Sequence, residues 1–102
     1  MDLRIASEPA DGSVAVRVSL RLTPRELNRI FLTGDRLIQL PCEGLVAEDG
    51  PTPMERPSIF LSELAERRDG YARLFADQAS ADRYATAVRA QLEAAMAALD
   101  EP

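Results

Sequence analysis

The feature that most constrains the fold is a strict alternation of apolar and polar residues between Val14 and Leu22. Valine or leucine stands at every even position, and arginine, serine or alanine stands between them. A period of two residues predicts a β-strand with one buried face. Residues 2–6 alternate in the same way, and Asp11-Gly12 favours a tight turn between the two segments. The sequence therefore predicts a β-hairpin at the start of the chain.

The register of this hairpin follows from its turn and its charges. A two-residue loop at 11–12 places Leu3 opposite Leu20 on the apolar face. It also places Asp2 opposite a basic residue on the polar face. A slip of two residues would instead set Arg4 against Arg17, and like charges directly opposite each other are destabilising. The first register is therefore predicted.

A short helix is predicted directly after the hairpin. Thr23 is a favourable N-cap, Pro24 suits the first helical position, and Glu26 completes a capping box. Gly34 is a typical residue just beyond a helix C-terminus.

The longest predicted element is a helix over residues 81–99, with Ser80 as its N-cap. Its apolar side chains recur at spacings of three and four residues, which is the pattern of an amphipathic helix lying on a sheet. These residues are Tyr84, Val88, Leu92, Ala95 and Leu99.

The middle of the chain predicts short strands at 36–40, 42–46 and 71–75, with a Pro-rich loop over 47–57. Residues 58–68 leave two alternatives open. A helix is favoured because residues 63–68 contain no β-branched side chain. The alternative is a hairpin that turns at Arg68–Gly70 and sets Arg67 opposite Tyr71.

These elements predict one α+β domain over residues 1–102. We expect an antiparallel meander of four to five strands, a short helix after the second strand and a long C-terminal helix packed on one face. The expected core residues are Leu3, Ile5, Val16, Val18, Leu20, Leu27, Phe31, Leu37, Leu74, Tyr84, Val88, Leu92 and Leu99.

Composition excludes several kinds of catalysis. The chain has no His and no Lys, since all twelve basic residues are Arg, so imidazole bases and Schiff-base chemistry are absent. The single Cys42 stands beside the anionic Glu43, which disfavours a reactive thiolate. Adjacent acids such as Glu48-Asp49 do not follow the spacing of a calcium loop. We therefore expect a non-enzymatic protein with no cofactor and no metal.

The candidate partner-binding residues are arginines and one exposed apolar side chain. Arginine suits the recognition of carboxylates because its planar guanidinium makes paired hydrogen bonds. Three arginines share the polar face of the hairpin, two lie on the first helix, and a methionine is presented by the Pro-rich loop. They are Arg4, Arg17, Arg21, Arg25, Arg29 and Met54. The favoured partner is another protein, which would make the chain a small accessory, regulatory or inhibitory protein.

Two other functions remain as alternatives. A nucleic-acid regulator could use the same arginines, but the net charge of −5 and the scarcity of aromatic residues disfavour it. A small metabolite-binding domain or carboxylate-based enzyme would need a sizeable pocket with two converging acids.

Further expectations concern assembly and location. A homodimer could form through the C-terminal helix, with Met96 widening its apolar face. The absence of an apolar leader or span, together with the single Cys, favours a cytoplasmic protein with no membrane contact. Arginine without lysine is typical of a GC-rich bacterium or its phage.

Overall fold

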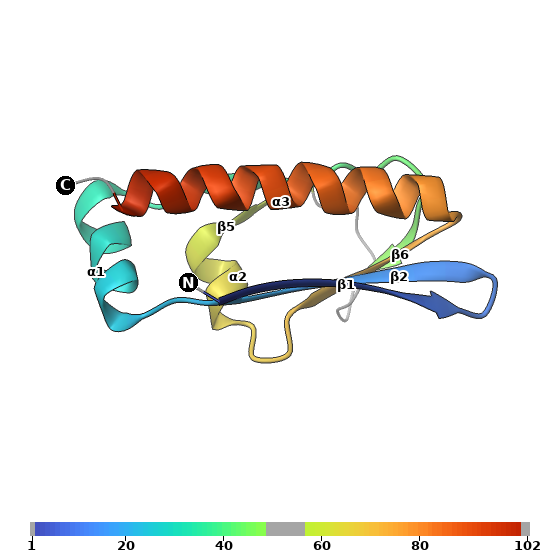
Figure 1. The fold of residues 1–102 in the computed structure, drawn as a ribbon, viewed down its shortest axis with the longest axis horizontal. Helices are drawn as coiled ribbons and strands as arrows, with labels where there is room; N and C mark the ends of the chain where they lie inside the picture. Colours follow the sequence, from blue (N-terminus) through green and yellow to red (C-terminus); the bar gives the residue numbers. More distant parts are fainter. Residues whose placement is uncertain (1, 49–56, 101–102) are drawn as a thin grey trace.

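The structure is a computed structural model that describes residues 2–48 and 57–100. It confirms the α+β class, with an antiparallel four-stranded sheet in the order β1-β2-β6-β4 and a separate two-stranded sheet of β3 and β5. The long helix α3 lies across one face of the larger sheet, and α1 stands beside the C-terminal end of α3 (Figure 1). The elements are β1 (Asp2–Ala10), β2 (Ser13–Arg21), α1 (Pro24–Thr33), β3 (Leu37–Gln39), β4 (Leu45–Glu48), β5 (Ser58–Phe60), α2 (Leu61–Glu66), β6 (Tyr71–Phe75) and α3 (Gln78–Asp100).

The hairpin of β1 and β2 has the predicted register. Leu3 pairs with Leu20 and Asp2 pairs with Arg21. The turn uses positive φ angles at both central residues, 42° at Asp11 and 83° at Gly12. Such a turn matches the twist of the strands it joins, so the register is unbroken along the whole hairpin.

The sheet is not the meander that the sequence predicted. The second neighbour of β2 is β6, which pairs antiparallel with Val14–Val18 and comes from much later in the chain. The predicted strand at 36–40 shortens to β3 and pairs with β5 instead. The predicted strand at 42–46 moves to β4, because residues 43–44 form a turn with a φ of 78° at Gly44. Strand pairing at long range depends on packing, which local periodicity does not encode.

The core lies between α3 and the inner faces of the strands. It contains the expected side chains Val16, Val18, Leu20, Tyr84, Val88, Leu92 and Leu99. Leu3, Ile5 and Leu27 are half-buried rather than fully buried. Phe31 was wrongly placed in the core, since it is 81% exposed; α1 buries Ile30 and Glu26 instead. Leu37 was also wrongly placed, since it is 49% exposed and Ile38 is the buried residue of β3.

The wrong face of β6 was also assigned to the core from the sequence, because Leu74 was placed there. Tyr71, Arg73 and Phe75 are buried against α3, whereas Leu74 is only half-buried on the other face. Successive side chains of a strand point to opposite faces, so burial of Tyr71 and Phe75 carries Arg73 inward with them.

Residues 58–68 follow neither alternative fully. Residues 58–60 form β5, and the helix α2 covers only Leu61–Glu66, so the predicted helix starts three residues late. The hairpin alternative is wrong, because β6 pairs with β2 and β4.

The long helix begins before its predicted N-cap. Helix α3 starts at Gln78, and the backbone N–H of Ser80 donates to Asp77 Oδ1 at 2.8 Å. Asp77 therefore caps the helix, and Ser80 is a buried residue of its first turn. Among the helices that the structure describes, none combines the length and apolarity needed to cross a bilayer.

Candidate functional site

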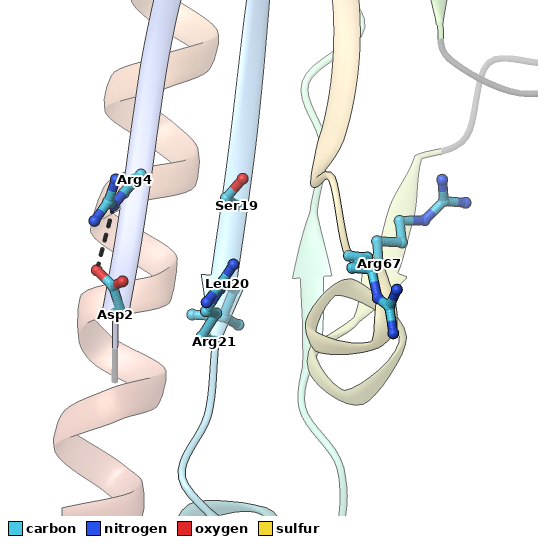
Figure 2. A pocket seen from close by; sticks show the side chains of 7 residues that line it. Asp2, Arg4, Ser19, Leu20, Arg21 and Arg67 are labelled. Carbon is cyan, nitrogen blue, oxygen red and sulfur yellow. Dashed lines mark ion pairs between the residues drawn. The ribbon is translucent and has the colours of Figure 1, made fainter.

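Arginine side chains from three segments line a hollow on the sheet face that points away from α3. The hollow has a volume of about 210 Å³ and is lined by Asp2, Arg4, Ser19, Leu20, Arg21, Arg67 and Arg68, which we call the arginine pocket. Figure 2 shows Asp2 and Arg4 on β1, Ser19 and Arg21 on β2, and Arg67 on the segment that follows α2, with α3 behind the strands. A second, more open hollow shares Arg21 and the 67–68 segment and adds Ala65 and Glu66.

The pocket exists because β2 is longer than β6. The ladder between them ends at Val18 and Tyr71, so Ser19–Arg21 extends beyond it. At this end of the sheet the 67–70 segment, which connects α2 to β6, lies against β2 and brings two arginines to it.

Two close contacts fix the 67–70 segment on β2. Gly70 has a φ of +81°, and a Cβ atom placed there would lie 2.6 Å from the Val18 carbonyl oxygen. Glycine is therefore required both for the backbone conformation and for the close approach. Arg17 Nη1 also donates a hydrogen bond to the Asp69 carbonyl oxygen at 2.6 Å. These contacts join residues that are about fifty positions apart in the sequence.

Two of the four pocket arginines have partners within the protein. Arg4 Nε lies 3.7 Å from Asp2 Oδ1, and both side chains are exposed. Arg67 lies 3.9 Å from Glu63 and stacks 4.8 Å above the Tyr71 ring. Arg21 and Arg68 are exposed, and no ion pair involving either is found in the described part of the chain. The pocket therefore combines positioned and solvent-facing guanidinium groups.

The structure brings together part of the predicted partner-binding set. Arg4 and Arg21 line the pocket, and Arg17 supports it through Asp69. Arg25 and Arg29 do not line it; Arg29 Nε instead donates to the Leu99 carbonyl oxygen at the end of α3. Met54 lies outside the described residues.

Sequence reasoning missed Arg67 and Arg68. Their signal was present as an Arg-Arg pair before a turn-forming Asp-Gly, next to a predicted strand. What the sequence could not show is that this turn would lie against β2.

A second cluster surrounds the buried Arg73. Its Nη1 donates to the Pro41 carbonyl oxygen at 3.3 Å, its Nη2 lies 3.6 Å from Cys42 Sγ, and its guanidinium carbon lies 5.8 and 5.5 Å from the rings of Tyr71 and Tyr84. Burial lowers the pKa of Arg73, but the contact with Cys42 and the neighbouring tyrosines outweigh it, so the pKa is raised and the side chain stays charged. The cluster places a cation inside the core between two aromatic rings.

An open groove of about 500 Å³ lies between β3 and α3, with Leu37, Ala94 and Ala98 among its lining residues. This groove and the two hollows on the arginine side each contain one acidic residue. The converging carboxylates that an acid–base enzyme would need are thus not brought together in them. Within residues 2–48 and 57–100 no group of three or more potential metal ligands is found.

No family model, no curated protein and no solved structure matches this chain.

Proposed function

We propose that this chain is a non-enzymatic protein-binding module, a small accessory, regulatory or inhibitory protein, whose arginine pocket binds acidic side chains of a partner protein. The observation that carries the proposal is the contrast between the pocket and the whole chain. Four arginines and one acid line the pocket, whereas the chain has a net charge of −5. A local cationic hollow on an acidic protein selects for a carboxylate presented at one place, because the surrounding field repels general polyanions.

The chemistry of the lining favours carboxylates over nucleic acid. Guanidinium groups hold carboxylates through paired, charge-assisted hydrogen bonds, and the Ser19 hydroxyl adds a further donor. The pocket lining contains no aromatic side chain on which a base could stack. The proposal includes a cytoplasmic location, which the single Cys supports because a reducing compartment favours free thiols.

The test is the binding of a fluorescent peptide that carries two adjacent glutamates in an otherwise uncharged sequence, measured by fluorescence anisotropy at low ionic strength. We expect binding that weakens as salt is added, and no binding of the matching glutamine peptide. Arg21→Glu and Arg68→Glu should each weaken the binding about tenfold, which is about 1.4 kcal/mol and the scale of one charge-assisted contact. Arg25→Glu makes the same charge change outside the pocket lining, so it is the matched control and should change the binding less than twofold.

Two results would contradict the proposal. Equal binding of the glutamate and glutamine peptides would remove the role of carboxylates. Tighter binding of a single-stranded oligonucleotide than of the acidic peptide, lost in the same variants, would instead support the nucleic-acid alternative.

A further inference from the structure

The two edges of the four-stranded sheet differ in kind. Within the described residues, β1 has β2 as its only neighbour in the sheet and β4 has only β6. The register between strand β4 and β6 shifts between Leu45 and Ala47. Irregular pairing is one way in which proteins keep an edge from pairing further. Strand β1 has nine residues in unbroken register with β2, so its outer side is long and regular.

The turn of the hairpin decides which backbone groups of β1 face outward. A two-residue turn is closed by a hydrogen-bonded pair, here Ala10 and Ser13, and the two kinds of pair alternate along an antiparallel ladder. The even-numbered residues of β1 therefore direct their N–H and C=O groups toward β2, and the odd-numbered residues direct theirs to the free edge. Pro9 occupies an odd position, where its missing N–H costs no hydrogen bond to β2.

We propose that β1 pairs antiparallel with β1 of a second copy of this chain, about a twofold axis at Ala6. In this register Arg4 of each copy faces Glu8 of the other, so the same opposite-charge pair forms twice. Both residues occupy positions that are not hydrogen-bonded to the new strand, where facing side chains are closest. Shifting the register by two residues sets Asp2 against Glu8, and the opposite shift sets both charged residues against alanines. The charges of β1 thus select one self-complementary register.

The backbone and the apolar face fit the same register. Ile5 and Ser7 of the two copies face each other at odd positions, where both of their backbone groups point outward. The N–H of Leu3 in one copy faces the carbonyl of Pro9 in the other. Proline has no backbone N–H, so its carbonyl is the only backbone group with which it can pair. Leu3 and Ile5 lie half-buried on the α3 side of the sheet, and the second copy would cover them further. The product is a continuous eight-stranded sheet, with both copies of α3 on one face.

This dimer uses a different surface from the C-terminal helix α3, which the sequence offered as a possible dimer interface. In the structure Met96 is half-buried against the core of its own chain. Arg4 lines the arginine pocket but Glu8 does not, so a variant of Glu8 separates dimerisation from the proposed function.

The test is the mass in solution by analytical ultracentrifugation, over about 1–500 μM and without any peptide. The wild-type chain should reach twice its 11.2 kDa, and Arg4→Glu and Glu8→Arg should each weaken the association at least tenfold. An equimolar mixture of these two single variants should regain the dimer mass, because every facing pair again joins opposite charges. The double variant Arg4→Glu with Glu8→Arg should dimerise by itself. Arg25→Glu is the matched charge control and should keep the wild-type association.

A substitution that removes a backbone hydrogen-bond donor tests the dimer independently of the charges. Ser7→Pro removes an outward-facing N–H and leaves the hydrogen bonds to β2 in place, so it should abolish the dimer while circular dichroism shows the fold retained. A wild-type chain that stays monomeric up to 500 μM would overturn the inference. So would a dimer that ignores both charge reversals, since that result would move the interface to another surface such as α3. Failure of the mixed single variants to associate would refute the Arg4–Glu8 register.

Discussion

Replacement of Gly70 by alanine tests whether the arginine pocket is assembled as the structure shows it. The φ of Gly70 is +81°, and a non-glycine residue in this left-handed region costs about 1–2 kcal/mol. The added Cβ would also lie 2.6 Å from the Val18 carbonyl oxygen and 3.2 Å from its carbonyl carbon. These are backbone atoms of a central strand, so the 67–70 segment must move, and overpacking of this kind costs about 1–3 kcal/mol.

The matched control is Gly12→Ala. Gly12 has nearly the same φ, +83°, but nothing lies within 4 Å of the position that its Cβ would take. Both substitutions reduce the conformational entropy of the unfolded chain equally, which stabilises each folded variant by about 0.4–1 kcal/mol. We therefore expect a loss of about 3 kcal/mol in the free energy of unfolding for Gly70→Ala and about 1 kcal/mol or less for Gly12→Ala.

The assay is urea denaturation followed by circular dichroism, together with the binding of the acidic peptide. Gly70→Ala should reduce both stability and binding, because displacement of the segment carries Arg67 and Arg68 away from β2. Gly12→Ala should leave the binding unchanged. Equal losses of stability in the two variants would refute the reasoning, because they would show that the 67–70 segment does not lie against β2.

Two further predictions concern the first helix and the core. Burial raises the pKa of Glu26 and its hydrogen bonds with Thr23 lower it, with a net lowering; the pKa of Asp77 is lowered by its hydrogen bonds from Ser80. A lowered native pKa means that the stabilisation is complete above about pH 4.5 and is lost as the pH falls. Glu26→Ala removes the carboxylate that accepts from the Thr23 N–H, so it should cost about 1 kcal/mol at pH 7 and should flatten the acid limb of thermal stability measured by calorimetry. Leu92→Ala should lower the free energy of unfolding by about 2–5 kcal/mol because Leu92 has no exposed surface, whereas Phe31→Ala should change it by less than about 0.5 kcal/mol. Urea titrations measure both values, and similar losses in the two variants would contradict the burial of Leu92 and the exposure of Phe31.

The capping box shows what could be predicted reliably from the sequence. Thr23 Oγ1 accepts from the Glu26 N–H at 3.1 Å, and Glu26 Oε1 accepts from the Thr23 N–H at 2.8 Å. Both bonds join residues three positions apart, so the residue types alone specify them. The N-cap of the long helix was misplaced because Asp77 and Ser80 are both capping residues, and the apolar pattern does not separate them.

The arginine pocket was only half predictable. Arg4 and Arg21 could be assigned to one face because the hairpin is local and its register follows from its turn. Arg67 and Arg68 could not, because their place depends on a segment that lies against a strand about fifty residues away. Neither helical nor strand periodicity carries information about that contact.

Residues close together in the chain settled the hairpin, its register and the start of the first helix, because each depends on interactions that span a short stretch. Tertiary packing decided that β6 pairs with β2, that Arg73 is buried between Tyr71 and Tyr84, and that Phe31 faces solvent. The physical reason is that an amphipathic pattern shows which face of an element is apolar, whereas the surface that covers this face is chosen only when all the elements compete for the same core.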